Sequence, residues 1–335
     1  MKSNSFTLSA AILLTMSVMA CGSNNQSSAS ASSQSDTGNI LDSMPAFNAD
    51  SAYQYVSRQV SMGPRVPGSA GHAECAVYLM DELRRHGADS IIDQTATVTA
   101  YNGDRLNIHN IMARYNPTAQ RRVMLVAHWD TRPWADNDPD EDNHTKPVLG
   151  ANDGASGVGI LLEAARQFNI RRPDVGVDIL LVDAEDYGES DSFNGNADSW
   201  CLGTQHWIRN MPYTAGNLPA YAILLDMVGG KGAVFNREYS SVKNAPAIVE
   251  KVWNIASQSG YSSRFSNEVS GGIIDDHIYL QKAGIPAIDI IECNNYETNS
   301  FPSTWHTVKD DMNSIDPTTL KAVGQTVINT VYSEK

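Results

Sequence analysis

A group of carboxylates follows an apolar segment near the middle of the chain. Residues 177–182 are apolar apart from one aspartate and have the length of a buried parallel strand. Asp183, Glu185 and Asp186 come directly after this segment. A solvated strand end is one interpretation, but like charges at this spacing repel each other, so an ordinary sheet edge gains nothing from them. We favour a metal site in which one carboxylate binds the cation and its neighbour moves protons.

Other residues that could do chemistry lie where further predicted strands meet loops, or within loops. They are His128, Asp130, Asp153, Asp226, Asp275, Asp276 and His306. Each alone has an ordinary explanation, such as a salt bridge, a buried histidine with its hydrogen bonds satisfied or, for Asp153, a helix cap. Their shared position favours a single site at the carboxyl edge of a sheet. Nitrogen and carboxylate ligands without cysteine suit a catalytic zinc that keeps one position open.

The elements that must position these residues alternate between helix and strand. Apolar or alternating runs predict strands at residues 91–101, 105–115, 123–127, 177–182, 221–226 and 287–291, with Asn102-Gly103-Asp104 as a hairpin turn. Helical spacing predicts helices at 50–62, 71–86, 152–168, 246–259 and 318–332. This alternation predicts an α/β fold with a largely parallel sheet. Residues 134–143 hold five acidic side chains without the glycine and final glutamate of an EF-hand, so we predict a solvated acidic loop.

The composition limits the class of protein. The 335 residues carry 24 Lys and Arg against 38 Asp and Glu, which gives a formal net charge of −14. This acidic balance argues against nucleic-acid binding, which needs a basic surface. Cys75, Cys201 and Cys293 have no paired spacing that indicates a disulfide framework or a zinc finger.

The N-terminus has the features of an export signal. Lys2 precedes an apolar stretch at residues 6–19 that is too short to span a bilayer. The stretch ends in a sequence similar to a bacterial lipobox with Cys21 as the lipidated residue; because Met19 is unusual there, an ordinary secretory signal is the alternative. We predict a signal peptide at 1–20 and a flexible, Ser-rich tether at 21–44. The expected location is membrane-anchored and facing the periplasm, with the lipid as the only membrane attachment.

The chain resembles the co-catalytic zinc aminopeptidase superfamily and, within it, the glutaminyl cyclase family. The matching motifs are His128 with Asp130, residues 152–157, Glu185 with Asp186, Asp226, and Trp305-His306-Thr307. The tryptophan before His306, the Asp275-Asp276-His277 run and the segment 63–69 tip the likeness toward the cyclases. The resemblance implies a three-layer α/β sandwich with a central mixed sheet and a single zinc-dependent catalytic domain at 45–335. It also implies a monomer that acts on peptides and exported proteins with N-terminal Gln.

The resemblance also implies roles for individual residues. One zinc would be held by Asp153, Asp186 and His306. Glu185 would shuttle the proton, with Asp226 and Asp275 in its hydrogen-bond network. Trp200 and Trp305 would wall the substrate pocket. Because adjacent side chains alternate along an extended chain, Glu185 and Asp186 should point to opposite sides and not bind the same ion.

Three features depart from the animal cyclases or leave an alternative open. Asp186 replaces the expected glutamate ligand, and Asp289 stands where animal cyclases carry a histidine. His128 and Asp130 are retained, and aminopeptidases use that histidine for a second zinc, so two metals and a di-zinc aminopeptidase remain the alternative. A non-catalytic binding protein is disfavoured, because it has no physical reason to keep so many mutually repelling carboxylates.

Overall fold

The computed structural model describes residues 43–190 and 196–335. The predicted signal peptide, Cys21 and nearly all of the predicted tether lie outside this range. Within it, no helix is long and apolar enough to cross a membrane.

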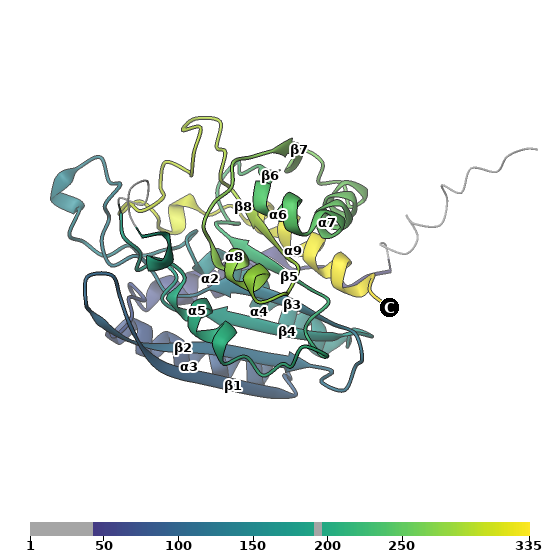
Figure 1. Cartoon of the computed structure of the whole chain (residues 1–335). Coiled ribbons are helices and arrows are strands. Elements are labelled where there is room, and N and C mark those ends of the chain that lie inside the picture. The colour runs from purple at the N-terminus through teal and green to yellow at the C-terminus, as the bar shows by residue number, and fades with distance from the viewer. Residues whose placement is uncertain (1–42, 191–195) are drawn as a thin grey trace, which may run out of the picture.

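The centre of the molecule is a six-stranded sheet with the strand order β1-β2-β4-β3-β5-β8 (Figure 1). Strands β3, β4, β5 and β8 pair in parallel, while β1 and β2 form an antiparallel hairpin beside β4. The strands are β1 (Ser90–Thr99), β2 (Arg105–Tyr115), β3 (Arg122–His128), β4 (Gly176–Val182), β5 (Tyr221–Asp226) and β8 (Ala287–Ile291). The prediction of a mixed, largely parallel sheet is confirmed.

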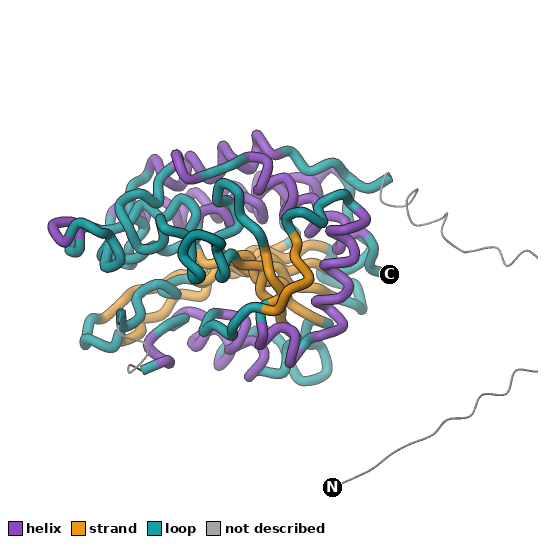
Figure 2. Tube along the Cα trace, turned by 90° about the horizontal axis from the view of Figure 1, so that it is seen from above, coloured by secondary structure: helices purple, strands orange, loops and turns teal. Residues whose placement is uncertain are grey.

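Helices cover both faces of the sheet, and Figure 2 shows the strands between the two layers. One apolar core joins the sheet to α2 (Ala49–Ser61), α3 (Ala70–Arg85), α4 (Ala155–Ile170), α7 (Pro246–Gln258) and α9 (Pro317–Tyr332). A second core joins the other face to α5 (Leu202–Arg209) and α8 (Asp276–Lys282). Strand β3 supplies Val123 and Leu125 to the first core and Met124 and Val126 to the second, as strand alternation requires.

Several short elements were absent from the sequence prediction. They are the helices α5, α6 (Tyr239–Asn244) and α8 and the two-stranded sheet of β6 (Phe235–Arg237) and β7 (Phe265–Val269). Each has eight residues or fewer, so few turns or pleats are available to make a periodic pattern visible. Two of these helices, α5 and α8, begin beside the carboxylates described next and therefore matter to the site.

Candidate active site

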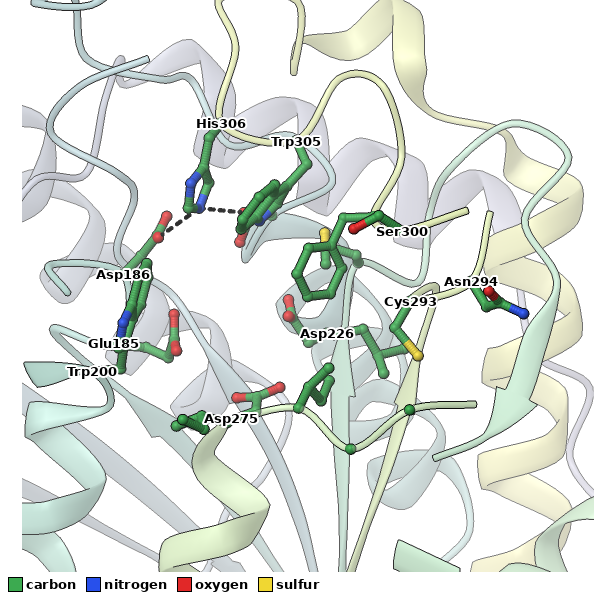
Figure 3. A pocket seen from close by; sticks show the side chains of 18 of the residues that line it. Glu185, Asp186, Trp200, Asp226, Asp275, Cys293, Asn294, Ser300, Trp305 and His306 are labelled. Atoms are coloured by element: carbon green, nitrogen blue, oxygen red, sulfur yellow. Dashed lines mark ion pairs between the residues drawn. The ribbon is translucent and has the colours of Figure 1, made fainter. Parts of the chain in front are cut away.

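Three predicted metal ligands from separate loops meet above the sheet. An oxygen of Asp153, an oxygen of Asp186 and a ring nitrogen of His306 all lie within 4.8 Å of one another. His306 Nε2 is 3.0 Å from Asp186 Oδ1 and 3.7 Å from Asp153 Oδ2. Figure 3 marks the ion pair of His306 with Asp186 by a dashed line. All three side chains are buried, and His306 Nε2 has no hydrogen-bond partner among the described residues. Two carboxylates and an unsatisfied imidazole nitrogen fit a zinc ion that keeps a fourth position open.

The loop before α4 holds Asp153 in place. The N-cap of α4 is Gly154 and no side chain caps the helix, so the alternative of Asp153 as a helix cap is wrong. Gly154 has a φ of 99°, and a Cβ there would lie 2.8 Å from the His128 ring. The Asp310 carboxylate accepts hydrogen bonds from the backbone amides of Asn152, at 2.8 Å, and Asp153, at 3.0 Å. Sequence reasoning missed Asp310, which lies 157 residues further along the chain.

Glu185 belongs to a different group from its neighbour Asp186. Its carboxylate lies near Asp275, and its Oε1 accepts a hydrogen bond from the Cys201 thiol at 3.3 Å. The extended chain that we assumed for this pair is wrong, because β4 ends at Val182 and Ala184 has a φ of 48°. Both side chains line one cavity, yet they join separate groups, which agrees with separate roles for them.

Burial changes the proton affinity of the carboxylates on the Glu185 side. Burial raises the pKa of Glu185 well above its ordinary value, and the nearby Asp275 raises it further. Burial and the charge of Asp226 raise the pKa of Asp275 to about 7. Burial likewise raises the pKa of Asp289, with Asp275 adding to the shift. Carboxyl groups with raised pKa values can hold and release protons near neutral pH.

His128, Asp153 and Asp226 form a second group of possible metal ligands. His128 Nε2 is 3.0 Å from Asp153 Oδ1 and 3.1 Å from Asp226 Oδ1. Asp130 lies behind this group, and its carboxylate accepts hydrogen bonds from the backbone amides of Glu185 and Asp186, both at 3.1 Å. Asp130 therefore fixes the turn that separates those two side chains.

Two indole rings form walls of the cavity, whose volume is about 480 Å³. The Trp305 ring stacks on the His306 imidazole at a centroid distance of 3.8 Å, and the Trp200 ring lies parallel to that imidazole at 6.0 Å. Ile273, Ile274 and Phe301 line it too. Both predicted pocket tryptophans thus line the cavity, and their contact with a substrate stays a prediction.

The acidic loop at 134–143 contacts the metal-ligand segment. Arg132 donates to both oxygens of Asp136, at 3.1 and 2.6 Å, and His306 Nδ1 is 3.5 Å from Asp136 Oδ1. Against the opposing effect of burial, His306 and Arg132 hold the Asp136 pKa well below its usual range. Asp138 is buried and accepts from the backbone amide of Val308 at 3.0 Å. The prediction of a solvated loop is wrong for these two aspartates; Asp140, Glu141 and Asp142 are exposed.

Comparison with known proteins places the chain in a family. The sequence profile of peptidase family M28 matches residues 110–331. A solved structure of a Bacteroides thetaiotaomicron glutaminyl cyclase bound to N-acetylhistamine is 50% identical. The aligned region covers 87% of this chain and 100% of the cyclase chain, with a TM-score of 0.84.

Two further similar proteins carry different names. A solved structure of a leucine aminopeptidase precursor from the same species is 49% identical, with a TM-score of 0.82, and covers 87% of this chain and 99% of that one. The Bos taurus glutaminyl-peptide cyclotransferase is 25% identical over 280 residues, which are 76% of this chain and 74% of the bovine protein. The match to the family profile over more than half of the chain, together with the shared fold, means that the chain belongs to peptidase family M28.

Proposed function

We propose that the protein is a glutaminyl-peptide cyclotransferase, an acyltransferase that converts N-terminal Gln of peptides and proteins to pyroglutamate with release of ammonia. The observation that carries the proposal is that one cavity holds both a candidate metal site and a separate carboxylate that could transfer protons. Asp153, Asp186 and His306 form one group there, and the buried Glu185 forms another with Cys201 and Asp275. The likeness to a glutaminyl cyclase at 50% identity over its full length supports the same activity.

Asp153, Asp186 and His306 would hold one zinc ion. When bound, the ion supplies Lewis acidity that polarises the γ-carbonyl oxygen of the glutamine side chain. Asp136 Oδ1 lies 3.5 Å from Nδ1, the far nitrogen of His306, and would orient the ring toward the cavity. Arg132 donates to the backbone carbonyls of Asp186, at 3.0 Å, and Gly188, at 2.9 Å, which holds the other side of the site.

Glu185 would carry the proton. The α-amine nitrogen forms a bond to the γ-carbonyl carbon, and the bond from that carbon to the amide nitrogen breaks. Glu185 accepts a proton from the attacking amine and delivers it to the departing nitrogen, so ammonia leaves and the enzyme ends in its starting state. The buried position that raises the pKa of Glu185 suits a group that must keep a proton between these two steps.

The indole walls would orient the substrate. The cyclisation is intramolecular, so its rate depends on how often the glutamine side chain folds back onto its own amine. The flat rings of Trp200 and Trp305 are walls of the same cavity, so they bound the space that is open to a substrate. A side chain held in that space has few extended conformations available.

A di-zinc aminopeptidase is the second candidate function. It is favoured by one observation: the group of His128, Asp153 and Asp226, which shares Asp153 with the proposed zinc ligands, would hold a second ion. Hydrolysis needs a water nucleophile, which paired metals can supply. The leucine aminopeptidase precursor at 49% identity shares the fold.

One experiment separates the two functions. The purified, zinc-loaded protein is incubated with a peptide that begins with Gln, and the mass of the product is measured by mass spectrometry. Loss of ammonia alone supports the cyclotransferase, and loss of the whole first residue supports the aminopeptidase. The Glu185→Gln variant, prepared identically, controls for a contaminating activity.

We also propose how the protein is organised and where it is located. Residues 1–20 would be a signal peptide, 21–44 a tether and 45–335 one zinc-dependent catalytic domain that works as a monomer. The lipobox-like sequence at Cys21 supports a lipoprotein that faces the periplasm. Multiple acyl chains give stable membrane attachment where one chain is marginal. Fractionation of cells that express Cys21→Ala tests the anchor, because a variant that stays with the membrane would contradict it.

A further inference from the structure

A second hollow adjoins the active-site cavity on the side away from the proposed zinc ligands. It has a volume of about 290 Å³ and shares two lining residues, Asn294 and Asn299, with the cavity. In Figure 3, Asn294 lies across the cavity from Asp186, and its side chain points away from the carboxylates. The two spaces therefore adjoin at these two asparagines.

Exposed hydrophobic side chains gather in and near the two spaces. Among the described residues, eight large hydrophobic side chains are exposed. Five of them lie in the cavity or hollow or next to residues that line them: Val234, Tyr239, Val269, Ile274 and Tyr296. The Tyr296 side chain is 85% exposed. Apolar side chains gathered at one opening mark a surface that binds another molecule.

The hollow itself is polar and acidic. Glu268 and Glu292 line it together with four asparagines, and none of its described lining residues is Lys or Arg. Glu292 is buried and accepts a hydrogen bond from Asn295 Nδ2 at 2.7 Å, whereas Glu268 is exposed and forms no ion pair with any described residue. Burial raises the pKa of Glu292, and the guanidinium of Arg264, which partly opposes this shift, lies 3.7 Å from the Asp316 carboxylate. Glu268 is therefore the carboxylate that is free to meet an incoming cation.

We infer that this hollow is a subsite for the third and later residues of the substrate, with a preference for Lys or Arg there. The inference rests on the proposed function, which places the N-terminal Gln in the cavity beside Glu185 and the indole walls of Trp200 and Trp305. The second residue would then lie on Ile274 and Phe301, and the chain would leave the cavity past Asn294 and Asn299. Amide side chains can donate to and accept from a peptide backbone without selecting its sequence, whereas Glu268 selects by charge.

The test compares substrates that differ only in the charge of the later residues. Gln-Phe-amide, Gln-Phe-Lys-Lys-amide and Gln-Phe-Glu-Glu-amide are assayed with the zinc-loaded wild type, with Glu268→Gln and with Glu74→Gln. Glu74 is an exposed acid on α3 that lines neither space, so it controls for the change in net charge.

We expect the wild type to favour the lysine peptide over the glutamate peptide in kcat/KM. An exposed ion pair gives about a two- to fivefold effect, which should arise in KM and weaken with added salt. Glu268→Gln should reduce this preference and leave Gln-Phe-amide unchanged, and Glu74→Gln should change neither. Equal kcat/KM for both long peptides, or an equal effect of Glu268→Gln on all three substrates, would overturn the subsite.

A measurement of peptide binding distinguishes failure of the proposed subsite from failure of the proposed function. Calorimetry with the two long peptides reports their affinity whether or not they react. A lysine peptide that binds more tightly through Glu268 but is not cyclised would contradict the proposed function and support the subsite. Cyclisation without any charge preference would contradict the subsite alone.

Discussion

Asp136 offers a sensitive test of how the acidic loop supports the site. Its carboxylate lies between the Arg132 guanidinium and His306 Nδ1, so it connects a buried cation to a proposed metal ligand. Asp136→Asn keeps the size of the side chain but removes its charge. The carboxylate uses Oδ1 toward Arg132 Nε and His306 Nδ1 and Oδ2 toward Arg132 Nη2. The amide replaces one of these oxygens with a donor, so it cannot accept from all three nitrogens.

The expected loss can be estimated from the type of contact. Replacing a carboxylate that orients a metal-bound histidine typically lowers metal affinity by about 10- to 100-fold, or roughly 1.4–2.7 kcal/mol. Arg132 still donates to the carbonyl oxygens of Asp186 and Gly188, so we expect the fold to survive and only the affinity to fall. At saturating zinc, most of the activity should return.

Zinc affinity is measured by competition with a chromophoric chelator, and thermal unfolding of the metal-free protein reports on the fold. Asp142→Asn is the matched control, because Asp142 belongs to the same loop, carries the same charge and is exposed. If Asp136→Asn binds zinc as tightly as the wild type or as Asp142→Asn, the loop does not orient His306.

Three further predictions concern the carboxylates and the metal. Glu185→Gln should lower turnover by on the order of a hundredfold while zinc stays bound. Asp186→Asn should lose zinc, and its activity should recover partly when metal is added. If Glu185→Gln loses zinc and Asp186→Asn keeps it, the two roles must be exchanged. Metal analysis should give one zinc per chain, since cyclisation needs no bridging hydroxide; two zincs that are both required for activity would contradict this. Burial raises the pKa of Asp276 to about 7, so the folded state binds its proton more tightly than the unfolded chain does. The free energy of unfolding therefore falls by ~1.4 kcal/mol per pH unit as pH rises from about 4 to about 7. Asp276→Asn should flatten the change of Tm over this range, and parallel Tm profiles for both proteins would refute the assignment.

The central strands could be predicted from the sequence because both of their faces are buried. Every residue of β3, β4 and β5 is buried, which explains the largely apolar runs that predicted these strands. The predicted strands at 221–226 and 287–291 match β5 and β8 to the residue. Helix α8 could not be found in this way, because its seven residues include buried polar side chains such as Asp276 and His277. Its N-cap is Asp275, for which the sequence predicts no helix.

The candidate site was predictable where it depends on the sheet edge. His128 pairs with Val182 across β3 and β4, and Asp226 with Ile291 across β5 and β8, so the registers bring the strand ends to one edge. The supporting contacts were not predictable, because they join loops that are far apart in sequence. Asp310 binds the amide of Asp153 across 157 residues, and nothing in the local sequence signals such a contact.

The environment of the carboxylates explains why adjacent acidic residues can do different work. His128 and His306 lower the pKa of Asp153 against the opposing effect of burial, so this carboxylate stays charged and suits a cation. Burial raises the pKa of Glu185, which no cation of the described residues contacts directly, so it suits proton transfer. Asp186 lies between these cases, because burial and the charge of Asp153 raise its pKa. A divalent ion between Asp153 and Asp186 would reverse the repulsion that they exert on each other. The proposed ligands are therefore two carboxylates whose mutual repulsion a metal would relieve, and Glu185 is the one that can work without contacting it.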